Sequence, residues 1–179
     1  MGEWTVPAFQ VPAQPAKKGG GGKKRGGKKG GKAAKAPPAS RVYKKQPTLA
    51  DITSDPLVDF ELKKAWNESN PNAPQVPNGT AGSTKQEQGG WIVWNKKTGK
   101  LEVQRVPAGT RDGLGTIVGT RPADTADQQV VSWFHTHPNV AAEGYTSGPS
   151  PGDTAWQAAE AKVPGVIETH DGRKTIPHP

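Results

Sequence analysis

The sequence predicts an α/β (α+β) domain in which a β-sheet is flanked by helices and preceded by a basic tail. The chain has 179 residues, which is room for one domain of ordinary size and a tail. Residues 49–179 begin with a segment of helical periodicity and continue with apolar segments of strand length. Helix signals occur both before and after these strands, which is typical of helices packed on a sheet.

Charge divides the chain into the same two parts. Residues 1–48 hold 12 of the 24 Lys and Arg residues but only one of the 16 Asp and Glu residues, Glu3. Residues 17–35 contain only Lys, Gly, Arg and Ala, a composition that cannot bury enough apolar surface to offset the entropy of ordering. We therefore predict a disordered basic tail over 1–48 and a domain over 49–179.

Two interpretations of the tail stay open. It is either an electrostatic arm that binds nucleic acid or another anionic surface weakly and in a salt-dependent way, or a solubilising linker. The remaining residues carry the other 12 basic side chains against 15 acidic ones, so the excess positive charge of the chain belongs to the tail.

The chain contains no cysteine, which excludes disulfides and thiolate ligands and leaves any metal to His, Asp and Glu. No apolar run of signal-peptide or membrane-spanning length is present. We expect a cytoplasmic protein, or one exported without a cleaved signal peptide.

The first predicted helix starts at Ser54-Asp55-Pro56, where a capping side chain precedes a proline. Apolar residues follow at helical spacing, and they are Val58, Leu62, Ala65 and Trp66. The helix should end near Asn67, before the loop of residues 71–83, which is rich in Pro, Asn and Gly.

The strand signals come after this loop. A hairpin is predicted from residues 90–95 and 101–106, with a turn containing Gly between them. A weaker strand is expected over residues 114–118 and a clear one over 129–134. A helix over about 151–162 and a final hairpin, 165–169 with 174–176, complete the domain.

Potential metal ligands follow the strand at 129–134. On an extended backbone His135 and His137 point the same way and offer two nitrogens side by side. Asp153 lies where the next helix begins, and a carboxylate is an accepted third ligand in hydrolytic zinc sites. Two plainer interpretations remain: the histidines are ordinary loop residues, and Ser150-Pro151-Gly152-Asp153 is only a capped helix start.

The segment Trp133-Phe134-His135-Thr136-His137-Pro138, with Ser150-x-x-Asp153, resembles the signature of the JAMM/MPN+ (JAB domain) zinc metalloproteases. In that family a glutamate lies upstream, before a glycine-containing strand, and Glu87-Gln88-Gly89-Gly90-Trp91-Ile92 is similar to that pattern. The similarity covers about residues 84–162. It is closest to small bacterial JAB-domain proteins, which are often end modules of polymorphic toxin or effector proteins.

The resemblance implies a JAB/MPN-like mixed β-sheet flanked by helices and a Zn²⁺ ion bound by His135, His137 and Asp153. It also implies that Glu87 is the general base that takes a proton from the zinc-bound water, and that Ser150 helps to stabilise the oxyanion. The reaction implied is hydrolysis of an amide bond in a protein or peptide substrate, such as a ubiquitin-like tail.

These residues lead to two hypotheses for function. The first is a zinc metallopeptidase or isopeptidase, which is compatible with a toxin or effector module. The alternative is a nucleic-acid-associated binding protein with a JAB-like fold and a basic arm. Glu87 favours the enzyme, because a binding module needs no base. Three further residues are interpreted as solvated rather than functional, namely Glu143, His170 and His178.

Overall fold

A five-stranded mixed sheet forms the centre of the domain, as the computed structural model of residues 36–74 and 84–178 shows. Two helices precede the sheet, α1 (Leu49–Ser54) and α2 (Pro56–Glu68). The strands are β1 (Gly89–Asn95), β2 (Lys100–Arg105), β3 (Gln128–His137), β4 (Gly165–Thr169) and β5 (Gly172–Ile176). Short helical segments lie between β2 and β4, and they are η1 (Gly115–Ile117), η2 (Ala141–Glu143), α3 (Pro151–Trp156) and η3 (Gln157–Ala161). The predicted α+β class is confirmed.

The strand order is β2-β1-β3-β4-β5. The pairs β1–β2, β1–β3 and β4–β5 are antiparallel, whereas β3 and β4 run parallel and are joined by the chain segment that carries α3. The two predicted hairpins are therefore confirmed, and β3 lies between them at the centre of the sheet. Its central position explains why it is buried along most of its length.

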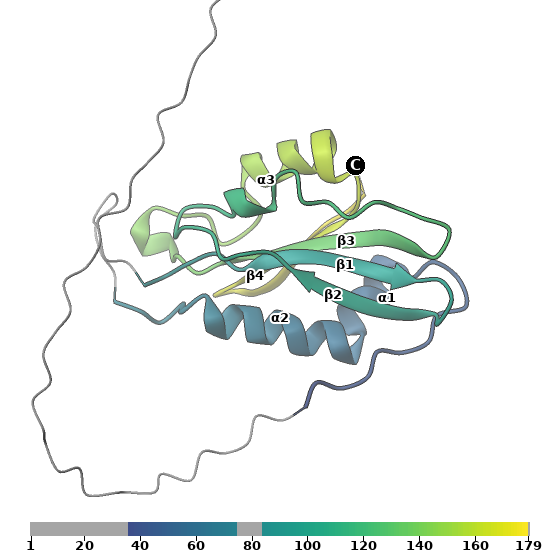
Figure 1. The fold of residues 1–179 in the computed structure, drawn as a ribbon. Helices are drawn as coiled ribbons and strands as arrows, with labels where there is room; N and C mark the ends of the chain where they lie inside the picture. Colours follow the sequence, from purple (N-terminus) through teal and green to yellow (C-terminus); the bar gives the residue numbers. More distant parts are fainter. Residues whose placement is uncertain (1–35, 75–83, 179) are drawn as a thin grey trace, which may run out of the picture. The chain divides into compact units, whose positions relative to one another are not determined.

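Helices cover both faces of the sheet (Figure 1). On one face α1 and α2 pack on a core that includes Ile92, Val131 and Phe134. On the other face α3 and η3 pack on a second core that includes Trp91 and Trp133. This arrangement is why β1 is apolar on both of its faces, as the sequence indicated.

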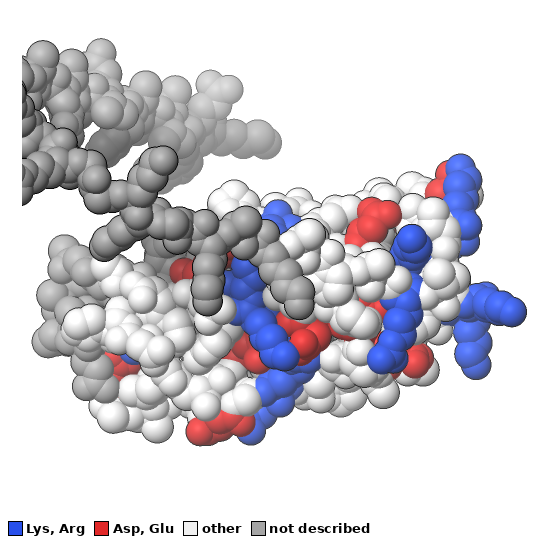
Figure 2. Space-filling view, turned by 90° about the horizontal axis from the view of Figure 1, so that it is seen from below, with Lys and Arg blue, Asp and Glu red and all other residues white. Residues whose placement is uncertain are grey.

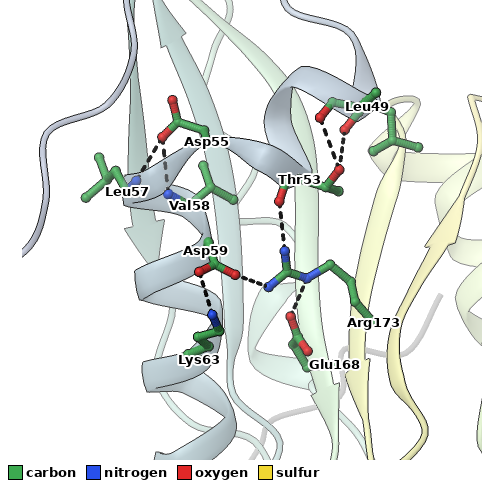
Figure 3. Close-up of polar contacts among 10 residues, drawn as sticks. Leu49, Thr53, Asp55, Leu57, Val58, Asp59, Lys63, Glu168 and Arg173 are labelled. Carbon is green, nitrogen blue, oxygen red and sulfur yellow. Dashed lines mark hydrogen bonds and ion pairs between the residues drawn. The ribbon is translucent and has the colours of Figure 1, made fainter.

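Asp55 begins α2 and also anchors the preceding segment to the domain. One carboxylate oxygen caps the helix by accepting the backbone N–H groups of Leu57 and Val58 (Figure 3). The other accepts hydrogen bonds from the Ser40 hydroxyl, the Arg41 backbone N–H and the Tyr43 hydroxyl. Because burial and the Asp55 carboxylate disfavour the phenolate, the pKa of Tyr43 rises to about 12.

Arg173 joins both N-terminal helices to β5, an edge strand of the sheet (Figure 3). Its guanidinium donates to the Thr53 carbonyl at 2.8 Å, to Asp59 of α2 at 3.0 Å and to Glu168 of β4 at 2.5 Å. One side chain therefore satisfies the last turn of α1 and fixes α2 over β4 and β5.

One sequence prediction is wrong, one is refined, and one helix was missed. The weak strand expected over 114–118 is the 3₁₀ turn η1, because Leu114 and Ile117 are both buried and lie three residues apart, a spacing that a strand cannot bury on one face. The helix expected over 151–162 changes character after Trp156 and continues as the π-helical η3, which ends at Lys162 in the left-handed region. The short helix α1 was not predicted.

The predicted boundary between tail and domain also lies too late in the sequence. Ser40 is buried, its hydroxyl accepts the Leu101 N–H, and Tyr43 N–H donates to the Gly99 carbonyl. The contacts of the domain thus begin before Thr48. The sequence does not indicate this, because Asp55 is recognisable as the buried partner of Ser40 only in the folded chain. The rest of the predicted tail, residues 1–35, and residues 75–83 of the predicted loop lie outside the described residues. Within the described part of the chain, no helix has the length and apolar character needed to cross a membrane.

Replacing Asp55 should be far more destabilising than removing an ordinary helix cap. Asp55→Ala removes the cap of α2 and also removes the acceptor shared by the buried Ser40 hydroxyl, the Arg41 N–H and the Tyr43 hydroxyl, so the free energy of unfolding should fall by about 3 kcal/mol. Thr48→Ala, which removes the exposed cap of α1, should cost only about 1 kcal/mol. Urea unfolding of both variants tests this, and equal losses would contradict the anchoring role.

Candidate metal centre

The two histidines are among the last three residues of β3, and their side chains lie on the face that α3 covers. His135 and His137 are separated by one residue, so their side chains project to the same side, and their ring centroids are 4.6 Å apart. The parallel strand β4 lies next to them in the sheet, where His135 pairs with Ile167 and His137 with Thr169. The side-by-side arrangement expected from the sequence is confirmed, with both histidines inside the strand.

Glu87 reaches the histidines from the segment just before β1. Thr136, between the two histidines, exchanges two hydrogen bonds with Gln88: its N–H donates to the Gln88 carbonyl at 2.9 Å, and its hydroxyl accepts the Gln88 N–H at 3.0 Å. This connection places Glu87 Oε2 3.4 Å from His135 Nδ1. A sequence separation of almost fifty residues is thus closed by the pairing of β1 with β3.

Gly89 keeps the space beside His135 open for another side chain. The two residues are partners in the β1–β3 register. A Cβ atom at position 89 would lie 2.3 Å from Leu114 Cδ2 and 2.4 Å from the Phe134 carbonyl oxygen. Only glycine therefore lets Leu114 lie against the sheet next to His135.

Ser150 and Asp153 form the capping box of α3, and Asp153 also reaches the histidines. The Ser150 N–H donates to Asp153 Oδ2 at 2.7 Å, and the Asp153 N–H donates to the Ser150 hydroxyl at 3.1 Å. Asp153 Oδ1 lies 3.3 Å from His135 Nε2, and Oδ2 lies 3.3 Å from His137 Nε2. The two interpretations of this motif are therefore compatible, because the cap itself aims the carboxylate at both rings.

All five predicted site residues line one cavity of about 300 Å³, and they are Glu87, His135, His137, Ser150 and Asp153. Part of its remaining wall is apolar and comes from η1, β3 and α3, through Leu114, Ile117, Trp133 and Trp156. Another part is polar and comes from Asp112, Asn139, Tyr145 and Thr146.

Burial and mutual charge perturb the titration of the cluster. Burial, reinforced by the negative charges of Asp153 and Asp112, raises the pKa of Glu87 to about 9, although a hydrogen bond from the Leu114 backbone partly offsets this. Burial lowers the pKa of His135 to about 4, so its imidazole is neutral at pH 7. Burial alone would raise the pKa of Asp153, but the hydrogen bond with His137, the charge of His135 and the Ser150 contacts lower it well below its usual range.

The cluster has the properties of a metal site. One donor atom from each of Glu87, His135 and His137 lies within 4.8 Å of the others. Glu87 Oε2 and His135 Nε2 are buried and make no hydrogen bond to a protein group, which is costly unless a ligand satisfies them. Neutral imidazoles and carboxylates are suitable ligands for a divalent cation. The group of Glu87, His135 and His137 could therefore hold a metal ion, with the Asp153 carboxylate next to both histidines.

The sequence did not indicate the polar cluster at one side of the cavity. Asp112 accepts hydrogen bonds from the Tyr145 hydroxyl and from Arg111 Nε, and Arg111 also donates to the Tyr145 hydroxyl. Asn139 donates to the Arg111 carbonyl at 2.6 Å, while its own Oδ1 is buried without a hydrogen-bond partner. Asn139 directly follows the His-Thr-His-Pro segment, which is the one sequence signal that could have marked it.

Glu143 is not the solvated acid that the sequence suggested. Its side chain is 4% exposed and forms an ion pair with Lys85, which is 2% exposed, at 2.9 Å. The same carboxylate oxygen accepts the Val140 N–H. This pair connects the segment before Glu87 with the loop after His137, so it belongs to the support of the site. His170, by contrast, is exposed, as expected, and its ring nitrogen lies 3.0 Å from the Pro138 carbonyl.

Comparisons of the chain with protein-family models, curated proteins and solved structures gave no match. The functional argument therefore depends on the residues of the cavity themselves.

The buried carboxyl of Glu87 should destabilise the metal-free protein at neutral and basic pH. The folded state keeps a proton that the unfolded chain loses near pH 4.5, so this contribution to stability decreases as the pH rises from about 4.5 to 9. Glu87→Gln should remove the decrease and stabilise the metal-free protein at pH 8 by on the order of 2 kcal/mol. Thermal unfolding of both proteins at pH 5 and pH 8, in chelator, measures this difference. A variant that is no more stable than wild type at pH 8 would contradict the burial of this group.

Proposed function

We propose that the protein is a zinc-dependent peptidase or isopeptidase that hydrolyses an amide bond in a protein substrate. The observation that carries this proposal is the convergence of two histidines and two carboxylates, from three separate segments, in one cavity. The resemblance of these segments to the JAMM/MPN+ signature supports the same reaction.

Zinc is the metal that fits the donors best. The chain has no cysteine, and two imidazoles with one carboxylate form a common ligand set of hydrolytic zinc sites. We assign His135, His137 and Asp153 as ligands, which leaves one position open. Zinc held by these three side chains would polarise the substrate carbonyl, acidify the attacking water and lower the pKa of Glu87 towards neutrality.

The side chains of the chain then divide the remaining work. Glu87 accepts a proton from the attacking water and delivers it to the leaving amine. The position of Glu87 beside His135 and its burial support this role. The Asp153 cap holds the two rings in place. The Ser150 hydroxyl accepts the Asp153 N–H, and its own proton is available to the oxygen that becomes negative during the attack.

A second, separate activity is supported by charge. Residues 1–48 carry half of the Lys and Arg residues of the chain with a single acidic residue. On the face of the domain seen in Figure 2, basic and acidic side chains are interspersed and do not gather by sign. We propose that any contact with nucleic acid or an anionic surface is weak and is made through the basic segment.

Zinc binding should depend on the histidines. Wild-type protein should bind about one zinc per chain, and His135→Ala should abolish tight binding because two of three ligands cannot retain the ion. Metal analysis after dialysis measures this. His170→Ala is the matched control, since His170 lies outside the cavity, and it should keep the metal. Stoichiometric zinc in a His135→Ala/His137→Ala double variant would remove the site assignment.

Glu87 should be needed for turnover and not for metal. Glu87→Gln preserves size but cannot accept the proton, so cleavage should fall by about 100- to 10,000-fold at unchanged zinc content. Cleavage of ubiquitin-like fusions and of a peptide library, with zinc quantified in both proteins, tests this. Equal rates at equal zinc occupancy would exclude Glu87 from the mechanism.

Binding to DNA or RNA should depend on the basic segment, residues 1–48. A truncated chain that begins at Ala36 keeps the Ser40 and Tyr43 contacts but loses the Lys- and Gly-rich residues. Affinity of the full chain should fall steeply with salt, as counterion release requires, and the truncated chain should not bind. Fluorescence anisotropy at several salt concentrations measures both. Binding that survives truncation would place the nucleic-acid surface on the domain.

A further inference from the structure

We propose that the apolar wall of the cavity, formed by Leu114, Ile117, Val118 and Trp156, is a subsite for a bulky apolar side chain next to the scissile amide. This inference rests on the proposed function and defines its substrate class. The substrate would be a protein chain with a large aliphatic or aromatic residue at the cleavage site, in place of a glycine-rich tail.

The wall is continuous with the metal centre. Leu114 occupies the space above Gly89, next to the Cβ atom of His135. Trp133 stacks edge to face with His135 at 5.2 Å between centroids, and Trp156 stacks in the same way on Trp133 at 5.1 Å. A substrate carbonyl at the histidines would therefore bring its neighbouring side chain onto apolar surface.

Val118 is the part of this wall that a bound apolar side chain would cover. It is 53% exposed. Among the described residues, Val42 is the one other large hydrophobic residue that is exposed. Val118 lines the cavity, whereas Val42 does not. Covering an exposed aliphatic side chain that borders a cavity is favourable because it removes apolar surface from water.

Size and charge select the occupant. A cavity of about 300 Å³ lies at the lower end of the range for ligand sites, which suits one side chain with its adjoining backbone and excludes a folded domain. Among the described residues that line it, none is Lys or Arg, so an acidic substrate side chain would find no basic partner in the lining. A glycine at the cleavage site would leave the exposed part of the wall, chiefly Val118, in contact with water.

Two small ligands with the same metal-binding group test the subsite without turnover. Leucine hydroxamate and glycine hydroxamate differ only in the side chain, and calorimetric titration into the zinc-loaded full chain should give about 10-fold or greater preference for leucine. Val118→Ser should reduce this preference several-fold at unchanged zinc affinity. Val42→Ser is the matched control, because it alters another exposed valine that lies outside the cavity, and it should leave the preference unchanged.

The same preference should exist without metal, since the wall belongs to the chain. In the metal-free protein, N-acetylleucinamide should shift the NMR methyl signals of Leu114, Ile117 and Val118 more than N-acetylglycinamide does. Equal affinity of the two hydroxamates, or methyl signals that respond equally to both amides or to neither, would overturn the subsite. A clear leucine preference with no cleavage of any peptide would instead keep the subsite and remove the peptidase activity.

Discussion

The antiparallel register of β1 and β3 determines where the site lies. It pairs Gly89 with His135, and the hydrogen bonds between Gln88 and Thr136 continue that register beyond the end of β1. Glu87 is thereby fixed beside the histidines, and the missing side chain of Gly89 admits Leu114 as the wall of the cavity. A shift of one residue would turn the histidines to the opposite face of the sheet, onto the core beneath α2.

The site concentrates polar groups that the fold alone does not satisfy. Glu87 and His135 are both buried, and each has a polar atom without a hydrogen-bond partner, which lowers stability unless a cation is bound. The surrounding contacts offset this cost. The buried Lys85–Glu143 pair holds the loop after His137, and the Ser150–Asp153 capping box orients its carboxylate. Such a combination of local instability and firm support is typical of functional sites.

Much of the fold could be predicted because its signals are local. The cap and proline before α2, the Thr-Gly turn of the first hairpin and the apolar run of β3 each lie within a few residues. The failures depended on distant partners. Ser40 is ordered by Asp55, and the turn at η1 is set by burial of Leu114 and Ile117 against the sheet.

The candidate site shows the same division. Spacing predicted that His135 and His137 lie side by side, and the family resemblance implied that Asp153 joins them; the contacts between the three side chains agree with both. Their assignment as zinc ligands stays a prediction. The Asp112–Tyr145 contact could not be predicted, because 33 residues separate two residues that have no pattern between them. Similarly, 58 residues separate Lys85 from Glu143, and only folding of the chain brings them together.

The position of a bound metal tests the central claim most directly. Crystals of the zinc-loaded full chain, measured at the zinc absorption edge, would locate the ion by anomalous scattering. The account predicts a single peak about 2.0–2.2 Å from one nitrogen each of His135 and His137 and from an Asp153 oxygen, with Glu87 beside the open position. A peak at exposed His170, or a cavity without zinc in crystals that contain the ion elsewhere, would contradict it.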